Sequence, residues 1–257
     1  MKTYETGVVE SVTCLAPMIY DMKVKAKMAA DAVPGQFVMI YPHDKSTLLP
    51  RPISICEACE GVLRFVFRIA GKGTKEFSDY KAGDSVRLLG PLGNGYNLET
   101  MKGKRVMVMG GGIGVPPMLE LMKQLNLSKI DVKGVFGYRD SNRFLKEDFE
   151  KYGDVFVATE DGSFGTKGNV LNAVSDCKLT ADVICACGPM PMLRAIKQYA
   201  FENGITAYIS LEERMACGVG ACLGCVCKTV NKDDHSKVNN ARVCTEGPVF
   251  DATEVEI

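Results

Sequence analysis

The sequence predicts a three-part β plus α/β protein: an N-terminal antiparallel β-barrel or sandwich, a doubly wound parallel-sheet domain and a small cysteine-rich C-terminal domain. Three observations predict it. Alternating polar and apolar stretches fill the first hundred residues, a glycine-rich turn opens a strand-and-helix segment, and four cysteines gather near the C-terminus. The expected domain boundaries are 1–100, 101–212 and 213–257.

Short strands separated by turns are predicted for the first part. Residues 20–27 alternate apolar with charged side chains, and residues 63–69 repeat this period of two. Gly and Pro at 34–35, 71–73 and 91–95 break the chain at intervals that suit a small antiparallel barrel or sandwich.

From residue 102 the pattern changes to strand, loop and helix. The predicted strands cover residues 105–109, 132–137, 155–159, 183–187 and 207–210, and the predicted helices cover 117–125, 143–152, 168–174 and 190–203. Such alternation is typical of a doubly wound parallel sheet, which binds ligands at the carboxyl ends of its strands.

The C-terminal cysteines Cys217, Cys222, Cys225 and Cys244 are spaced C-x4-C-x2-C with a distant fourth, the plant-type spacing for a 2Fe-2S cluster. Zinc is the rival, but its structural sites usually pair ligands in two short knuckles, so the x4 gap favours iron–sulfur. Cys227 competes as the fourth ligand. Because it follows Cys225 by only two residues on one short segment, we expect Cys244, which enters on a separate strand.

Two motifs at the ends of predicted strands suit a dinucleotide. Residues 110–117, GGGIGVPP, lie between a strand and a helix, so the backbone can approach a pyrophosphate at the helix N-terminus. Pro117 stands where Gly or Ala would close the usual fingerprint, and a tight turn without a ligand is the alternative. Residues 187–190, CGPM, end a later strand at the same edge, although an ordinary helix entry with a buried cysteine is the alternative there.

Two segments of the first part carry groups that could hold phosphates. They are RPIS at 51–54 and RIAGKGT at 68–74. A salt-bridged surface arginine is the ordinary explanation for either segment taken alone.

Composition restricts the partners and the compartment. Lys plus Arg equals Asp plus Glu at 31 each, which argues against binding to nucleic acid or anionic membranes. The first ten residues lack the apolar core of a signal peptide, and the nearly uncharged run 106–119 is too short and too rich in Gly and Pro to span a membrane. With eleven cysteines, the expected location is the cytoplasm, where thiols serve metals or catalysis. Of these, Cys14, Cys177 and Cys185 are expected to be small buried side chains.

In this order the segments resemble the ferredoxin reductase superfamily and, within it, the electron-transfer subunits of class B, NAD-dependent dihydroorotate dehydrogenases. The resemblance covers essentially the whole chain, and its last motif is the most specific. The motifs are RPIS at 51–54, GKGT at 71–74, GGGIGVPPM at 110–118, EDGSxG at 160–165, CGPMPML at 187–193 and SLEERMACGVGAC at 210–222.

The resemblance implies an FAD-binding barrel, an NAD-binding α/β domain and a 2Fe-2S domain. The FAD residues would be Arg51, Pro52, Ile53, Ser54, Phe67, Arg68, Ile69, Gly73 and Thr74. The NAD residues would be Gly111, Gly112, Ile113, Gly114, Cys187, Gly188, Pro189 and Met190. Arg51 and Thr74 would help to hold the FAD phosphates, and Ser54 would form a hydrogen bond near the edge of the isoalloxazine ring. Ile53 stands where the superfamily has Tyr, so aliphatic packing would replace ring stacking.

These cofactors together predict an electron converter. NAD accepts hydride, a two-electron unit, whereas a 2Fe-2S cluster passes single electrons, so a flavin must lie between them. Hydride transfer requires no acid–base pair on the protein, and we expect no catalytic residue. The three parts leave no room for a carbon-substrate site, and a TIM-barrel partner alone needs about 250 residues. The resemblance implies an FMN-containing catalytic subunit that oxidises dihydroorotate in pyrimidine biosynthesis, in a heterotetramer of two plus two chains.

Two alternatives remain open from the sequence. One is a related flavin and iron–sulfur subunit of a hydrogenase, sulfide or ferredoxin-linked NAD(P)H reductase, and the other is a zinc-stapled nucleotide-binding module without redox turnover. The choice between NAD and NADP is also open on the residues. Arg139 and Arg143 could receive a 2′-phosphate, whereas Asp140 would oppose it, and NAD is expected on resemblance.

Overall fold

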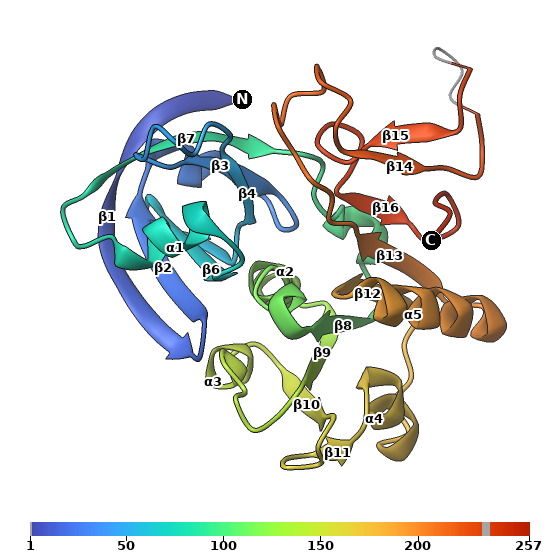
Figure 1. Cartoon of the computed structure of the whole chain (residues 1–257). Coiled ribbons are helices and arrows are strands. Elements are labelled where there is room, and N and C mark those ends of the chain that lie inside the picture. Colours follow the sequence, from blue (N-terminus) through green and yellow to red (C-terminus); the bar gives the residue numbers. More distant parts are fainter. Residues whose placement is uncertain (1, 233–236) are drawn as a thin grey trace.

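The computed structural model describes residues 2–232 and 237–257, and this part of the chain forms two seven-stranded sheets and a two-stranded sheet. An antiparallel sheet and a parallel sheet meet along one face, and the C-terminal residues lie beside their junction (Figure 1). The predicted fold class, antiparallel barrel followed by a doubly wound parallel sheet and a small C-terminal domain, is confirmed.

The first sheet is antiparallel, in the order β4-β3-β7-β1-β2-β6-β5. Its strands are β1 (Thr3–Ala16), β2 (Ile19–Lys25), β3 (Phe37–Tyr41), β4 (Arg51–Ser54), β5 (Glu57–Cys59), β6 (Val62–Arg68) and β7 (Ser85–Leu92), and the short helices η1 (Lys27–Asp31) and α1 (Lys72–Asp79) connect them. One continuous segment, 51–59, pairs with β3 through β4 and with β6 through β5. This segment therefore closes the sheet into a barrel.

Apolar and polar side chains alternate along the barrel strands, so that one face of each strand lies in the core. In β2, Met22 and Val24 are fully buried while Lys23 and Lys25 are exposed, as the period of two predicts. Asp21 breaks the pattern, because it is a carboxylate with only 6% of its surface exposed. A buried charge is costly unless it is paired, so a cation must lie beside it.

The second sheet has the order β11-β10-β9-β8-β12-β13-β16, parallel except for β16. Its strands are β8 (Arg105–Gly111), β9 (Asp131–Tyr138), β10 (Asp154–Thr159), β11 (Thr166–Lys167), β12 (Val183–Cys187), β13 (Thr206–Ser210) and β16 (Val249–Asp251). Its helices are η2 (Leu98–Met101), η3 (Gly112–Gly114), α2 (Met118–Leu127), α3 (Lys146–Phe149), α4 (Val170–Asp176) and α5 (Met190–Asn203).

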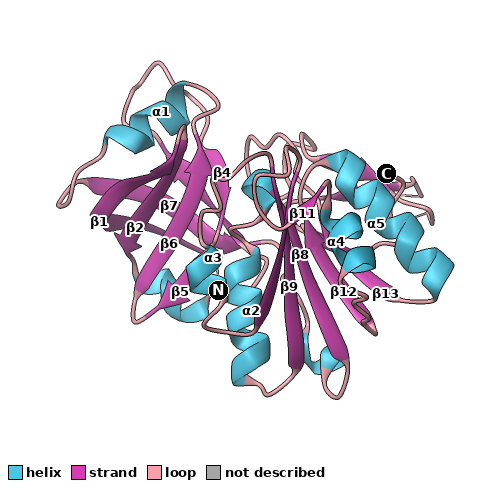
Figure 2. Ribbon diagram, turned by 90° about the horizontal axis from the view of Figure 1, so that it is seen from below, coloured by secondary structure: helices cyan, strands magenta, loops and turns pink. Residues whose placement is uncertain are grey.

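Helices cover both faces of the parallel sheet. Figure 2 shows α2 and α3 on the face toward the barrel and α4 and α5 on the opposite face. The chain runs outward from β8 in one direction to β9 and β10, then returns to β12 and β13 on the other side of β8. The strand order therefore reverses between β8 and β12, where sheets of this kind bind their ligands.

The C-terminal part holds a two-stranded ladder of β14 (Val226–Lys228) and β15 (Asn240–Arg242). The chain then returns to the parallel sheet, where β16 pairs with β13. Residues 249–251 thus belong to the second sheet, although the sequence assigns them to the third domain. No helix in the described ranges is long and apolar enough to cross a bilayer.

Two local predictions are wrong. The helix expected over 143–152 is the single turn α3, because Leu145 before it has a left-handed backbone with φ of 68°. Cys14 and Cys177 are exposed, and Cys185 is the only one of the three presumed core cysteines that is buried.

Candidate functional site

The two nucleotide motifs lie against each other at the strand reversal. Gly110, near the end of β8, pairs with Cys187 at the end of β12. A Cβ atom placed on Gly114 would lie 2.4 Å from the Cys187 carbonyl oxygen, and one on Gly111 would lie 2.5 Å from Met192 Sδ. Glycine at these positions lets the loops touch, and α2 and α5 both begin beside this contact. Two helix N-termini at a strand reversal fit the pyrophosphate of a dinucleotide.

Cys187 lies at the centre of this corner and is partly accessible. Burial raises the pKa of its thiol to about 12, although a hydrogen bond with Ser210 lowers the pKa somewhat. The side chain is therefore neutral at physiological pH and adds no negative charge to this corner. Met192, which the sequence motif contained but we did not single out, packs against Gly111 and Gly188.

The barrel has a basic hollow beside the start of α1. A Cβ atom on Gly73 would lie 2.9 Å from Arg51 Nε, so the guanidinium rests on the first turn of this helix. A cavity of about 410 Å³ opens next to it. Its lining consists of Ser46, Thr47, Leu48, Leu49, Arg51 and Lys72. Two cations at a helix N-terminus fit the pyrophosphate of FAD. Lys72 is not among the FAD residues expected from the sequence, although its position inside the GKGT motif could have indicated it.

The Thr74 hydroxyl forms its hydrogen bonds within its own turn. It accepts hydrogen bonds from the backbone N–H groups of Ala70 and Gly71, at 2.9 and 3.2 Å, and donates to the Gly71 carbonyl. The side chain is buried, so its hydroxyl holds the turn together. The groups left for a phosphate are the backbone N–H groups at the start of α1.

The remaining predicted FAD residues lie on two strand ends that contact each other, β4 and the end of β6. Ser54 and Arg68 are exposed, whereas Ile53 is partly buried. Phe67 is buried between Tyr20 and Phe77, with ring centroids 6.3 and 6.1 Å away. Neighbours on a strand point to opposite faces, so Arg68 faces outward while Phe67 belongs to the barrel core. Pro52 and Ile69, both partly buried, flank these positions.

The cysteine loop surrounds two of its sulfurs with backbone donors. Cys217 Sγ accepts hydrogen bonds from the N–H groups of Val219 and Cys222, both at 3.4 Å, and Cys222 Sγ accepts one from Gly224 at 3.4 Å. Burial raises the pKa of Cys217, but these backbone donors outweigh it and bring the pKa to about 6. Donors of this kind stabilise the thiolate form, which is the form that binds metals.

The other two sulfurs come from separate segments. The Val243 N–H donates to the Cys225 carbonyl at 2.9 Å, which brings Cys244 beside Cys225. Burial, and after it the neighbouring Cys225 thiol, raise the pKa of Cys244 to about 12. Cys227 instead lies on β14 opposite Ala241.

These sulfurs therefore form two pairs, Cys217 with Cys222 and Cys225 with Cys244. Within the described ranges, no three His, Cys, Asp or Glu side chains are grouped tightly enough to hold one metal ion. A 2Fe-2S cluster takes two ligands on each iron, whereas a structural zinc takes four on one ion. Two adjacent pairs of cysteines match the two ligands that each iron of such a cluster takes.

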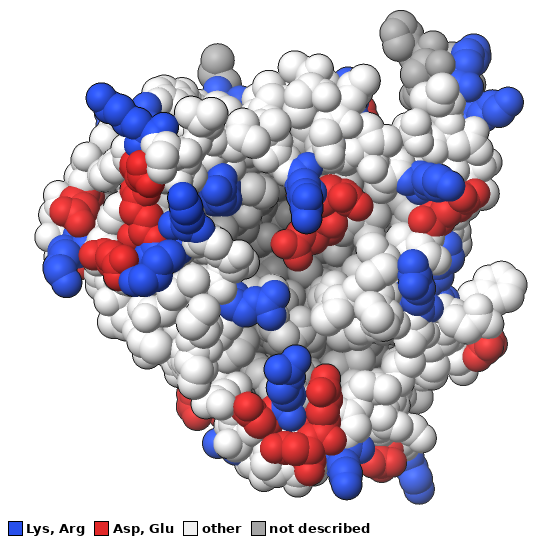
Figure 3. Space-filling model, viewed as in Figure 1, with Lys and Arg blue, Asp and Glu red and all other residues white. Residues whose placement is uncertain are grey.

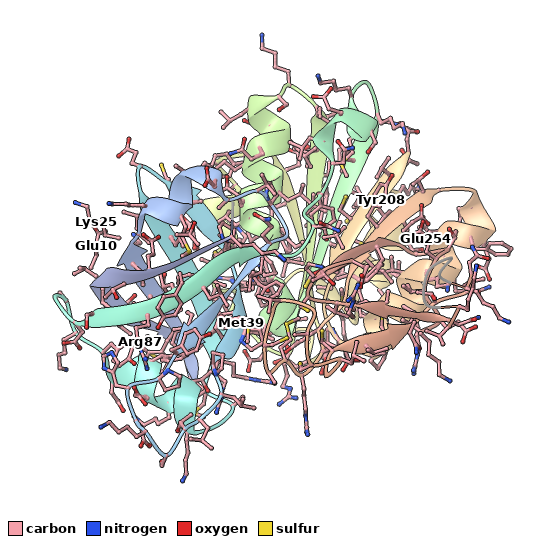
Figure 4. The ribbon with its side chains drawn as sticks, turned by 90° about the horizontal axis from the view of Figure 1, so that it is seen from above. Glu10, Lys25, Met39, Arg87, Tyr208 and Glu254 are labelled. Atoms are coloured by element: carbon pink, nitrogen blue, oxygen red, sulfur yellow. The ribbon has the colours of Figure 1, made fainter. Side chains whose placement is uncertain are left out.

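The cysteine loop also packs onto the barrel. A Cβ atom on Gly218 would lie 2.7 Å from Met39 Cγ and 3.0 Å from Leu92 Cδ1. Asn94 Nδ2 donates to the backbone oxygens of Thr245 and Glu246 at 3.1 and 3.0 Å. Met39 thus lies where barrel and C-terminal residues meet (Figure 4).

All three parts border one hollow. Figure 3 shows a recess in the middle of this face, between the barrel, the parallel sheet and the C-terminal residues, with both basic and acidic side chains on its rim. The fold and this site define a class of protein, a flavin- and nicotinamide-dependent reductase with an attached iron–sulfur domain.

Comparisons with known proteins place the chain within that class. Residues 212–256 match the family model for the iron–sulfur cluster binding domain of dihydroorotate dehydrogenase B. The electron transfer subunit of dihydroorotate dehydrogenase B (NAD(+)) from Streptococcus mutans is 42% identical, over 94% of this chain and 93% of the relative. Its counterpart from Fusobacterium nucleatum is 42% identical over 100% of both chains. The chain belongs to this family of electron transfer subunits.

Solved structures agree in fold. A structure of the NADH-dependent reduced ferredoxin-NADP oxidoreductase has a TM-score of 0.86 and 27% identity, covering 97% of this chain and 89% of that chain. A ferredoxin NADP+ reductase from Neisseria gonorrhoeae with bound FAD and NADP has a TM-score of 0.67 and 16% identity, covering 82% and 94%. The second similarity concerns the fold alone.

Proposed function

We propose that this chain passes electrons from a dihydroorotate dehydrogenase catalytic subunit to NAD+, through a 2Fe-2S cluster and FAD. The observation that carries the proposal is that three parts meet around one recess: the barrel with its basic pocket, the parallel sheet with its nucleotide corner, and the C-terminal part with its cysteine loop. Family membership supports a dihydroorotate dehydrogenase catalytic subunit as the electron donor.

The barrel pocket is our proposed site for FAD. When bound, this cofactor supplies the exchange between a two-electron hydride and single electrons. Arg51 and Lys72 would neutralise its pyrophosphate, Thr74 would hold the turn that presents the N–H groups, and Ser54, Ile53 and the backbone of β6 would border the ring. The side chain of Phe67 would support this wall from within the barrel.

The corner of residues 111–114 and 187–190 is our proposed site for NAD(H). Its close-packed glycines would admit the pyrophosphate, and the neutral Cys187 thiol would lie beside the nicotinamide. We favour NAD over NADP because the curated relatives are named for NAD(+).

Cys217, Cys222, Cys225 and Cys244 are our proposed cluster ligands, and Cys227 is outside this set.

Two apolar side chains in the cysteine loop are exposed: Val219 with 41% and Leu223 with 64% of their surfaces. Apolar side chains around an electron port favour protein docking. We propose that they meet an FMN-containing catalytic subunit in an assembly of two plus two chains. We also propose a cytoplasmic location, because eleven cysteines, four of them our proposed cluster ligands, suit a reducing compartment.

The test is co-purification with a candidate catalytic subunit, followed by a visible spectrum, metal analysis and an assay of dihydroorotate-dependent NAD+ reduction. We expect flavin, two irons per chain and activity. Zinc without flavin would support the non-redox module instead. A loaded protein that oxidises NADH but is inactive with every such partner would support a reductase subunit of another complex.

A further inference from the structure

Six charged side chains meet where the barrel touches the nucleotide domain. Their exposed fractions range from 4% to 25%, so they are largely shielded from water. We call this group the interdomain ion cluster. Its members are Asp21, Glu57 and Arg64 from the barrel and Glu120, Lys123 and Asp148 from the nucleotide domain.

Arg64 on β6 is the centre of the cluster. Its Nε and Nη2 donate to Asp21 Oδ2 at 3.0 and 2.9 Å, which neutralises the buried carboxylate on β2. Its Nη1 lies 2.9 Å from Asp148 Oδ2 on α3 and 3.5 Å from Glu57 Oε2 on β5. One guanidinium therefore joins two barrel strands and a helix of the other domain, and its planar fork constrains their angles.

A second set of contacts attaches α2 to β5. Lys123 Nζ lies 3.0 Å from Glu57 Oε1, and Glu120 Oε2 accepts the Ala58 N–H at 3.0 Å. The Glu120 N–H in turn donates to the Cys56 carbonyl at 3.0 Å. The first turn of α2 is thus bound to the barrel by backbone and side chain together (Figure 2).

The cluster connects the two elements that lead to the cofactor sites. β6 carries Arg64 and, four residues later and therefore about 13 Å further along the strand, Arg68 at the proposed FAD site. α2 starts directly after the glycine loop, and β6 also contacts η3 within that loop. A change in the cluster would therefore be transmitted to both sides of the hollow.

Apolar packing alone would hold the domains together without fixing their angle. Val66 and Ile19 of the barrel pack with Val115 and Met118 of the nucleotide domain in one buried group. Such packing is non-directional, whereas charge-assisted hydrogen bonds are strongly directional. Buried ion pairs are also weak contributors to net stability, so their value here lies in geometry.

We propose that Glu57, Arg64, Glu120 and Lys123 are positioning residues for hydride transfer, because they set the separation between the nicotinamide and the isoalloxazine ring. This inference rests on the proposed function. Hydride transfer, which oxidises NADH to NAD+ as it reduces the flavin by two electrons, needs reacting atoms about 3–3.5 Å apart, and a misplacement of about 1 Å costs about 100-fold in rate.

The test compares Arg64→Met, Arg64→Lys and Lys123→Met with the unmodified protein, all purified with cofactors and partner. Anaerobic stopped-flow mixing with NADH yields the rate of flavin reduction and the NADH dissociation constant. We expect Arg64→Met to reduce the rate 10- to 100-fold while NADH affinity and FAD content change less than twofold. Arg64→Lys should recover part of the rate, since it keeps the charge but loses the fork.

Amide hydrogen exchange of the protein without NADH is the readout that does not depend on activity. Arg64→Met should speed exchange at Ala58 and Glu120, whose N–H groups cross the interface. The control is Arg105→Met, which also removes a guanidinium that donates two hydrogen bonds to an aspartate, Asp182, but inside one domain, and it should change neither readout.

Several outcomes would overturn the inference. One is an unchanged rate of flavin reduction in Arg64→Met that carries its cofactors. A second is a loss of FAD and NADH binding as large as the loss in rate. A third is unchanged amide hydrogen exchange at the interface. If Arg64→Met does not fold, Lys123→Met and Glu57→Gln decide by the same criteria. If the unmodified protein itself does not reduce its flavin with NADH, the proposed function fails instead.

Discussion

The surroundings of each sulfur determine which cysteines can bind the cluster. Cys217 and Cys222 accept backbone hydrogen bonds in an exposed loop, whereas Cys225 and Cys244 are buried next to each other. Cys227 lies on the two-stranded ladder opposite Ala241 and packs against the buried group that contains Cys225 and Cys244. The position of each sulfur around the cysteine loop therefore separates the proposed ligands from Cys227 better than the sequence spacing of the cysteines does.

A first prediction separates Cys244 from Cys227. Cys244→Ser should abolish the intact cluster, because it removes one of the two thiolates contributed by the buried pair. Cys227→Ser should keep it. Iron and acid-labile sulfide per chain, with the visible spectrum, measure the outcome. Retention in Cys244→Ser together with loss in Cys227→Ser would reverse the ligand assignment.

A second prediction concerns pH. The Asp182 carboxylate accepts hydrogen bonds from the Arg105 side chain and backbone, which lower its pKa from 3.8 to about 2. A lowered pKa in the folded state stabilises the fold above pH 3.8, and this stabilisation is lost as the pH falls towards 2. Asp182→Asn should flatten the pH dependence of unfolding in that window. Urea titrations at pH 5 and pH 2.5 test it, and an unchanged slope would contradict it.

At the level of elements, β8 and β12 build the nucleotide corner by lying side by side. Their parallel register brings Gly110 opposite Cys187, so two loops about 75 residues apart in sequence touch. Gly114 is needed because the other loop lies against it, whereas Gly112 is favoured by its own left-handed backbone with φ of 55°. The function of the corner therefore belongs to the pair of strands.

Substitution of Gly114 tests this contact. A Cβ atom there would lie 2.4 Å from the Cys187 carbonyl oxygen, which neither loop can avoid without moving. Gly114→Ala should weaken NADH binding at least tenfold, about 1.4 kcal/mol, while FAD and iron remain. Gly204→Ala, at an open left-handed helix end, should cost stability only and is the control. Unchanged NADH affinity in Gly114→Ala would remove the corner from the NAD site.

At the level of the whole molecule, β16 couples the C-terminal part to the parallel sheet. It pairs with β13, and the Leu211 N–H donates to the Pro248 carbonyl at 2.9 Å. Phe250 lies in the same buried group as Cys225 and Cys244. The fold of the nucleotide domain and the integrity of the cluster loop should therefore depend on each other.

Phe250→Ala tests this coupling. Loss of a buried phenyl ring should destabilise the protein by about 3 kcal/mol and should also speed release of iron. Thermal unfolding and the rate of iron loss to a chelator are the measurements. Phe201→Ala, at a position 80% exposed on α5, is the control and should change neither. Destabilisation without faster iron loss would mean that the two parts are independent.

Several features were predictable because their signals are local. Alternation of side chains predicts barrel strands such as β2 and β6, and the residues around Gly112 or Cys187 identify a nucleotide loop from a few neighbours. The position of Lys72 beside Arg51 and the hydrogen bonds and packing of Thr74 and Phe67 were not predictable in this way. Each depends on whether a side chain points into the barrel core, into its own turn or into the hollow, and that direction is set by packing.

The sequence by itself determined the order of the three parts, the cysteine spacing and the two nucleotide motifs, because each is written in residues close together along the chain. The tertiary structure alone decided how residues 51–59 close the barrel, how β16 joins the second sheet and which sulfurs pair. It also decided that Arg64 meets carboxylates from three other elements. These features depend on contacts between distant residues, which no local pattern encodes.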